Sequence, residues 1–207
     1  MQETGTQTDL WQQLKTPLSI VGGFVLMLWL IEGIDQLVFG GSLDGFGVRP
    51  RSLDGLLGIL WAPFLHGGFR HLIANTGPLL ILGSIVMLSR RLRDFFLITF
   101  IVTLIGGLGA WLIGPRLSVH LGASGLIFGY FGFLLLAAYF ERSCRATLIA
   151  LVVLLLYSGI IWGVLPQGGG ISWQTHLFGF IGGGVAAYVL SQRQNGLNIN
   201  VHDPISS

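Results

Sequence analysis

Six runs of mostly apolar residues, separated by polar, charged or glycine-rich stretches, occupy most of this chain. A bilayer hydrocarbon core of about 30 Å needs about 20 apolar residues in one helix, and each run approaches that length. The predicted spans are 18–39, 71–89, 95–114, 122–140, 147–166 and 173–190. The pattern therefore predicts an all-α membrane protein, a compact bundle of six transmembrane helices.

The segments outside the spans differ in polarity. Residues 1–17 and 191–207 are polar, so we expect two short solvated tails around one membrane domain, 18–190. Residues 40–70 mix Gly, Arg and Asp with apolar residues, and we do not expect them to cross the bilayer. This stretch predicts an amphipathic segment in the outer interface, with Trp61 at the depth of the lipid headgroups.

Composition supports a membrane protein and excludes several other classes. Of the 207 residues, 52% are hydrophobic and 10% are charged, whereas soluble domains carry about 25% charged residues. The formal net charge is +2, but the basic residues lie at the ends of apolar runs and form no continuous patch for nucleic acid. The single cysteine, Cys144, makes no internal disulfide, and no Cys/His cluster has metal-ligand spacing, so we expect no metal and no cofactor.

Basic residues also predict how the chain is oriented, because Lys and Arg accumulate on the cytoplasmic side. With the N-terminus inside, inner segments hold seven of them and outer segments four. The inner ones are Lys15, Arg90, Arg91, Arg93, Arg142, Arg145 and Arg193, and the outer ones are Arg49, Arg51, Arg70 and Arg116. We therefore expect a multi-pass protein of the cell (inner) membrane with both termini in the cytoplasm.

Four polar residues are predicted to share one depth. In this orientation the second, fourth and sixth spans all run from outside to inside. His71 and Asn75 lie in the first turns of the second span, Ser124 begins the fourth, and His176 lies about one turn into the sixth. A rise of 1.5 Å per residue puts each roughly 5–10 Å below the outer boundary. Polar groups at that depth are costly and favour a functional site.

Ser124 and His176 are the residue types needed for covalent acyl transfer. A serine hydroxyl becomes nucleophilic when a base removes its proton, and an imidazole is suited to that role. A carboxylate usually orients such a histidine, but the second, fourth and sixth spans carry none at this depth. We therefore predict a Ser–His dyad, with Glu32 and Asp35 of the first span as less favoured candidates for a third member.

Donors for an oxyanion are predicted close to the serine. Ser124 opens a helix, where a free backbone N–H and the helix dipole favour negative charge. Asn75 and His71, four residues apart, share one helical face and can add side-chain donors.

Glycines are predicted to bring the fourth and sixth spans together. Gly125 and Gly129 in one span, and Gly179 and Gly183 in the other, form faces of small residues that allow close helix packing. Gly122 and Gly125 are also expected to leave space for a substrate backbone beside the serine.

Each candidate also has a structural interpretation. A lone serine in a membrane helix usually bonds to its own backbone, and a histidine at a helix start is often interfacial. Only the depth that the four polar residues share favours the interpretation that they form one functional site. By the same reasoning we expect His66, His120 and His202 to be interfacial or solvated, and the glycine-rich loop 166–170 to be a flexible lid.

Three motifs resemble those of the rhomboid family of intramembrane serine proteases. They are Gly-x-Ser-Gly at 122–125, His176-x-x-Gly179, and His66-x4-His71-x3-Asn75. The resemblance covers about 49–190 and implies a six-helix rhomboid-like core. It implies Ser124 as nucleophile, His176 as general base and acid, and oxyanion support from Asn75 and His71. The implied partners are membrane lipids and single-span protein substrates, cut near a small residue.

Two positions depart from that family. Many members have a tyrosine four residues after the serine, packed on the catalytic histidine, and this chain has Phe128, which keeps the ring and loses the hydroxyl. A Trp-Arg pair found in the outer loop of some members is not evident.

Two other functions remain as alternatives. A catalytically inactive relative that binds membrane helices is disfavoured because every expected chemical residue is present. A small transporter or channel is disfavoured because the inner halves of the fourth and sixth spans are Gly, Ala, Leu and Phe rather than polar.

Overall fold

The structure is a computed structural model that describes residues 4–166, 168 and 170–202, and the side chains of 14–193 within those ranges. Helices dominate the described chain, as predicted. The α-helices are α1 (Thr4–Ile34), α2 (Leu53–Trp61), α3 (Phe69–Ser89), α4 (Leu92–Ile113), α5 (Ser124–Glu141), α6 (Cys144–Tyr157) and α7 (Trp173–His202). Shorter helical turns are η1 (Asp35–Phe39), η2 (Ser42–Phe46), η3 (Ala62–Phe64) and η4 (Ser158–Val164).

Five helical segments in the described residues are long and apolar enough to cross a membrane. They are Leu14–Phe39, Phe69–Ser89, Leu92–Ile113, Ser124–Glu141 and Cys144–Val164, and they match the first five predicted spans. The sixth predicted span lies in α7, which is less apolar because Gln174, Thr175 and His176 occupy its first turn. α7 packs along both α4 and α5, so close helix contacts accompany its lower apolar content.

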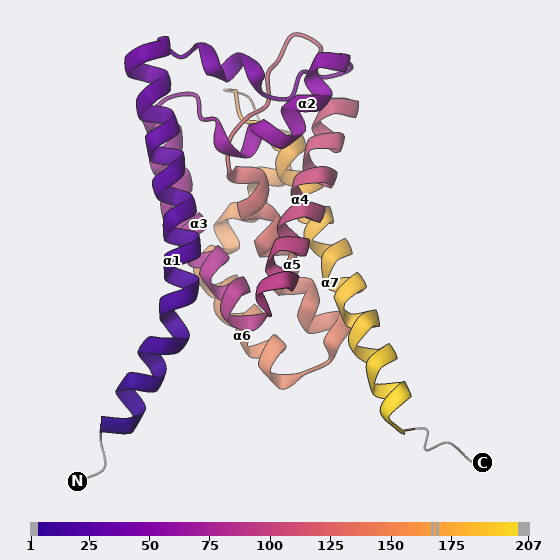
Figure 1. Ribbon diagram of the computed structural model, residues 1–207. Coiled ribbons are helices and arrows are strands. Elements are labelled where there is room, and N and C mark those ends of the chain that lie inside the picture. Colours follow the sequence, from indigo (N-terminus) through magenta and orange to yellow (C-terminus); the bar gives the residue numbers. More distant parts are fainter. Residues whose placement is uncertain (1–3, 167, 169, 203–207) are drawn as a thin grey trace.

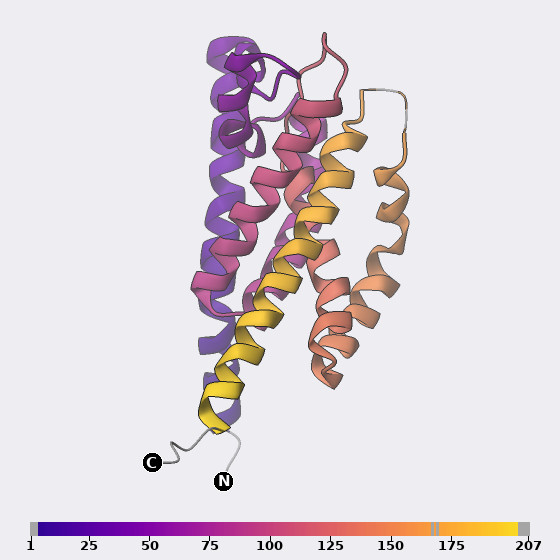
Figure 2. The same ribbon diagram turned by 90° about the vertical axis from the view of Figure 1, so that its right-hand side faces the viewer.

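The first and last helices extend beyond the predicted spans. α1 begins at Thr4, inside the stretch 1–17 expected to be a tail, and α7 continues to His202, past the predicted end at 190. A helix satisfies its own backbone hydrogen bonds and can continue where the apolar run stops. Figures 1 and 2 show the start of α1 and the end of α7 at the same end of the molecule, opposite α2.

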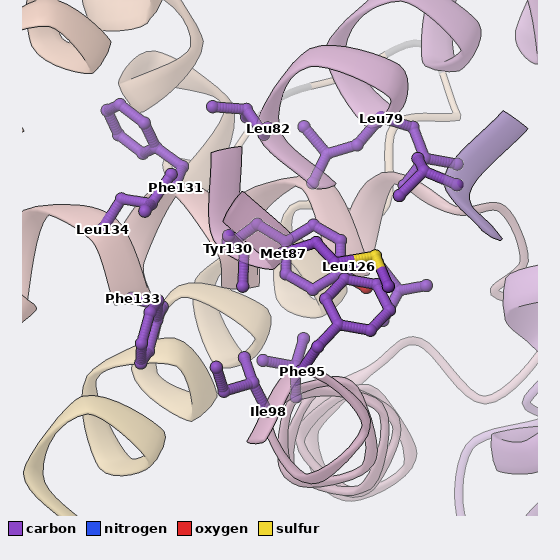
Figure 3. Close-up of a cluster of buried hydrophobic side chains, with 14 of the residues drawn as sticks. Leu79, Leu82, Met87, Phe95, Ile98, Leu126, Tyr130, Phe131, Phe133 and Leu134 are labelled. Atoms are coloured by element: carbon purple, nitrogen blue, oxygen red, sulfur yellow. The ribbon is translucent and has the colours of Figure 1, made fainter. Parts of the chain in front are cut away.

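The core lies where α3, α4 and α5 meet, with α1, α6 and α7 packed around it. Figure 3 shows Leu79 and Leu82 of α3, Phe95 of α4, and Tyr130 and Phe131 of α5 within one cluster. The Tyr130 hydroxyl is within hydrogen-bond distance of the Thr99 hydroxyl, 2.8 Å away, so the polar end of this ring is satisfied inside apolar surroundings. These contacts make α5 the central helix of the bundle.

The segment between α1 and α3 folds over one end of the bundle (Figure 1). Its helix α2 packs against α4 and leaves Trp61 55% exposed. A Cβ on Gly58 would lie 2.2 Å from the Gly47 carbonyl oxygen, and one on Gly55 would lie 2.1 Å from that of Arg49. The two glycines therefore let α2 lie directly on the preceding loop.

Candidate active site

The turn before α5 places Ser124 at the helix start, as predicted. Gly122 has φ +110°, a conformation that favours glycine, and a Cβ there would lie 2.6 Å from His71 Cε1. The chain can therefore pass tightly against His71 only with glycine at this position. One residue later, the backbone N–H of Ala123 donates to His66 Nε2, 3.3 Å away, and α5 begins at Ser124.

The structure brings the two candidate catalytic side chains together. Ser124 Oγ lies 2.9 Å from His176 Nε2, and His176 Nδ1 lies 3.0 Å from the carbonyl oxygen of Gly163 in η4. A carbonyl only accepts, so Nδ1 carries the hydrogen, and Nε2 of the neutral ring is the acceptor. Ser124 thus donates its hydroxyl hydrogen to His176. That is the tautomer a serine nucleophile needs.

An aromatic ring holds the imidazole from one face. The rings of Phe128 and His176 are stacked, with centroids 4.1 Å apart and planes 8° from parallel. Phe128 lies one turn after Ser124 on α5. The same helix therefore supplies both the hydroxyl and the surface on which the imidazole rests.

Glycines bring α5 and α7 into backbone contact. A Cβ on Gly179 would lie 2.4 Å from the Gly125 carbonyl oxygen, and one on Gly183 would lie 2.0 Å from that of Gly129. The predicted approach of these two helices is confirmed. It follows from the absence of side chains, since any larger residue at Gly179 or Gly183 would overlap the backbone of α5.

The expectation that Gly122 and Gly125 leave space for a substrate is wrong. A Cβ on Gly125 would lie 2.8 Å from the Thr175 methyl group, and the corresponding space at Gly122 is taken by His71. The space left by these two glycines beside the serine is filled by the side chains of His71 and Thr175. The space for a ligand lies elsewhere.

That space is an open cavity of about 980 Å³ bordered by α3, α5, η4 and α7. Four of the predicted residues, His71, Asn75, Ser124 and His176, line it together with Phe128. Arg70, Ala74 and Pro78 of α3 also line it, as does Gly67 just before this helix. One continuous face of α3 therefore borders the cavity. The four polar residues predicted to share a depth therefore share a cavity.

Two donors of α3 point at the turn before Ser124. The Gly67 N–H donates to His71 Nδ1, 3.4 Å away, so the hydrogen of the neutral His71 ring is on Nε2, the side facing Gly122. Asn75 is buried, and its Nδ2 has no hydrogen-bond partner among the described residues. A buried amide N–H₂ without a partner is costly unless something binds it.

Glu32 and Asp35 lie away from this cavity. Both are about 1% exposed, and Asp35 Oδ1 accepts the Leu43 N–H, 2.9 Å away. Among the described residues that line the cavity, none is a carboxylate. In the structure, the group that orients His176 is the Gly163 carbonyl, and the alternative of a carboxylate third member finds no support.

The sequence profile of the Rhomboid domain matches residues 54–193, well over half of the chain. The chain belongs to the rhomboid family. This is a family of intramembrane proteases, and with its several apolar helices the chain is an integral, multi-pass membrane protein.

Relatives of this rhomboid protein include mycobacterial and Bacillus proteins. The uncharacterized protein Rv1337 of Mycobacterium tuberculosis is 48% identical over 198 residues, 89% of this chain and 82% of that protein. The uncharacterized protein ML1171 of Mycobacterium leprae is 45% identical over 185 residues, 83% of this chain and 72% of that protein. Rhomboid protease GluP of Bacillus subtilis is 31% identical over 179 residues, 80% of this chain and 33% of that protein.

Two histidines of this rhomboid protein were misplaced by sequence reasoning. His66 and His120, expected to be interfacial or solvated, are 0% and 4% exposed. His66 packs edge-on against His71, with ring centroids 5.2 Å apart, and burial, followed by the charge of His71, lowers the pKa of His66 to about 4. The side chain of His202 and residues 167 and 169 of the predicted lid lie outside the described part of the chain.

The spacing of five residues between His66 and His71 was the signal that could have placed His66 beside His71. The Gly163 carbonyl could not have been found in this way, because every residue carries a carbonyl and only the fold selects one.

Proposed function

We propose that this rhomboid protein is an intramembrane serine endopeptidase that hydrolyses a peptide bond in or near the transmembrane segment of single-span membrane proteins. The observation that carries the proposal is the 2.9 Å contact between Ser124 Oγ and His176 Nε2, with the tautomer set by the Gly163 carbonyl. It rests also on the membership of the family of intramembrane proteases.

In the first half of the proposed reaction, Ser124 Oγ attacks the scissile carbonyl carbon as its proton passes to His176 Nε2. Collapse of the tetrahedral intermediate breaks the C–N bond, and His176 returns the proton to the leaving amine. An acyl-enzyme ester on Ser124 remains. Water then attacks this ester with His176 again as base, and the serine is restored.

The oxyanion is proposed to form beside α3. The Ser124 backbone N–H at the start of α5, Asn75 Nδ2 and His71 Nε2–H are the donors. A donor already fixed in a partly desolvated site costs no reorganisation when charge develops. The unpartnered Nδ2 of Asn75 is the clearest support, since an oxyanion would supply the acceptor that it lacks.

We place the protein in the cell (inner) membrane with both termini in the cytoplasm, so that the cavity faces outward. The excess of Lys and Arg in the segments on the proposed inner side supports this orientation. The start of α1 and the end of α7 lie at one end of the bundle (Figure 1), as this orientation requires.

The test is cleavage of a single-span substrate reconstituted with the purified protein in liposomes. Wild type should cut within or next to the substrate helix, and Ser124→Ala and His176→Ala should each lower kcat at least about a thousandfold. Ser191→Ala is the matched control, because Ser191 is a buried serine of α7 that bonds back to the Tyr188 carbonyl, 2.7 Å away. It should cleave like wild type. If Ser124→Ala gives the same products as wild type, Ser124 is not the nucleophile. If wild type cuts none of a panel of substrates, the inactive helix-binding alternative replaces the proposal.

A further inference from the structure

His120 lies outside the cavity and yet beside both halves of the dyad. It is four residues before Ser124, 4% exposed, and its backbone N–H and C=O pair with those of Val48 at 2.9 and 2.8 Å. Its neighbours Val119 and Leu121 line the cavity, whereas His120 does not. The His120 ring thus lies behind the cavity lining, in contact with Ser172, which does line the cavity.

The His120 ring is held between two hydroxyl groups. Nε2 lies 2.9 Å from Ser118 Oγ, and Nδ1 is hydrogen-bonded to Ser172 Oγ. Ser172 Oγ is in turn 2.6 Å from Thr175 Oγ1. The chain Ser118–His120–Ser172–Thr175 thus starts in the loop before α5 and ends in the first turn of α7.

The Pro115 carbonyl determines which group donates in each of these hydrogen bonds. Ser118 Oγ donates its only hydrogen to the Pro115 carbonyl, 2.7 Å away, so it accepts from His120 Nε2–H. Nδ1 of the neutral ring is then an acceptor and receives the Ser172 hydroxyl hydrogen, and Thr175 donates to Ser172. Burial lowers the pKa of His120, which favours this neutral form.

The Thr175 end of this series of hydrogen bonds is in contact with the dyad. Thr175 precedes His176 directly, and its methyl group fills the space beside Gly125, the residue after Ser124. Ser172 comes immediately before α7, and its carbonyl accepts the His176 N–H, 3.2 Å away. Ser172 and Thr175 therefore flank His176, and His120 holds both relative to the loop that carries Ser124.

We propose that His120 is a positioning residue, which through Nδ1 fixes the first turn of α7, and with it His176, against the loop that carries Ser124. The inference rests on the proposed function of the dyad and deepens it. Small displacements of reacting groups lower rates steeply, by up to about 100-fold for 1 Å. His120 would thus act on the rate of reaction at Ser124 without touching a substrate.

Two isosteric substitutions separate the two sides of the ring. The oxygen of Asn in His120→Asn occupies the place of Nδ1 and can accept from Ser172, whereas the amide of Gln in His120→Gln reaches the place of Nε2 and contacts Ser118 only. His120→Phe keeps a ring and loses both contacts. The proposal expects His120→Asn to react with a fluorophosphonate at Ser124 within about threefold of wild type, and the Gln and Phe variants to be slower by about tenfold or more.

Two further kinetic results are expected. Because His120 does not line the cavity and acts through the position of His176, the loss should fall more on kcat than on KM. Adding Ser172→Ala to His120→Gln should cost less than Ser172→Ala costs in the wild-type background, because the contact between His120 and Ser172 is already lost, while the contact of Ser172 with Thr175 is lost in both cases. Equal rates for the Asn and Gln variants, or a loss that follows a fall in melting temperature, would overturn the proposal.

A second readout does not depend on activity. Hydrogen exchange of a peptide covering 172–180 should be faster in His120→Gln and His120→Phe than in wild type and His120→Asn, because the first turn of α7 is released. If wild type proves inactive but exchange follows this order, the proposed function fails and the positioning inference stands. If exchange is the same in all four proteins, the positioning inference is wrong, whatever the activity.

Discussion

The two sides of the bundle that border the dyad are packed in opposite ways. On one side α5 meets α7 through glycine backbone, and 67% of the apolar stretch of α5 is buried. On the other side α6 and η4 have only 6% of theirs buried and turn residues such as Leu155, 83% exposed, outward. Figure 2 shows this pair at the edge of the bundle.

The difference shows that one region sets the relative position of Ser124 and His176, whereas another region forms the exposed side of the cavity. The tight contact of α5 and α7 fixes how far Ser124 lies from His176. The exposed side nevertheless supplies one part of the site, because the Gly163 carbonyl of η4 sets the tautomer of His176. A movement of η4 could therefore alter the base without separating the dyad.

The largest effect is expected from filling the tight contact. A Cβ in Gly183→Ala would lie 2.0 Å from the Gly129 carbonyl oxygen and 2.6 Å from the Phe133 nitrogen. Backbone must shift, so the variant should lose about 1–3 kcal/mol of stability, together with its activity. Gly184→Ala, one residue along, meets only the flexible end of Leu136 and should be close to wild type. Thermal unfolding in detergent compares the two, and equal melting temperatures would show that α5 and α7 are packed no more tightly at Gly183 than at Gly184.

A smaller, purely catalytic effect is expected on the exposed side. In Gly163→Ala the new Cβ would lie 2.5 Å from Phe128 Cζ and 3.3 Å from His176 Nδ1. The stacked ring and the imidazole must both move, and kcat should fall about tenfold to 100-fold with little change in melting temperature. Gly159→Ala is the matched control in η4, since a Cβ there meets nothing within 4 Å. An unchanged kcat for Gly163→Ala would show that the positions of the Phe128 ring and the imidazole do not limit the rate.

The pH dependence of stability tests the buried loop beside Ser124. Because the pKa of His66 is lowered to about 4, the unfolded chain binds a proton in the range from about 6.5 down to about 4 while the folded protein does not. Stability is therefore full above pH 6.5 and falls as pH is lowered, by about 3 kcal/mol at most.

The variant His66→Gln isolates this effect, because Gln keeps an acceptor for the Ala123 N–H and does not titrate. As pH is lowered from 7 to 4.5, the unfolding midpoint of wild type should fall relative to that of the variant. This comparison is needed because Asp44 acts with the opposite sign. Burial and then the charges of Asp35 and Glu32 raise its pKa to about 6, which favours the folded state at low pH. A constant difference would place His66 in contact with solvent.

The smallest effect is expected at the outward face of α6. Leu155→Ala removes a side chain that is 83% exposed, so stability in detergent should change by less than about 0.5 kcal/mol. Val153→Ala on the same helix removes a fully buried side chain and should cost about 1 kcal/mol or more. If both variants unfold at the same temperature, α6 is packed more evenly than the structure indicates.

The sequence predicted the features that depend on long runs and on depth. The third and fourth predicted spans, 95–114 and 122–140, lie close to α4 and α5 because an apolar run of that length has one stable form in a bilayer. The sequence also predicted the pairing of Ser124 and His176, since the predicted orientation put both at one depth. The ends of α1 and α7 were missed because hydropathy predicts the part of a helix that lies in the membrane and not where the helix itself begins and ends.

Burial outside the spans was not predictable in the same way. His66 and His120 lie in loops whose composition resembles an exposed interface, and they become buried only because those loops fold onto the end of the bundle. The role of Gly163 is carried by a backbone atom, which leaves no mark on the choice of residue beyond the need for a small one.

The central claim, that Ser124 is a nucleophile activated by His176, is tested most directly by mass spectrometry of the purified protein after reaction with a fluorophosphonate. The account predicts one adduct, on the peptide that contains Ser124, formed in wild type and Ser191→Ala and absent in both Ser124→Ala and His176→Ala. An adduct on another residue, or labelling of Ser124 that persists at the wild-type rate without the imidazole, would contradict it.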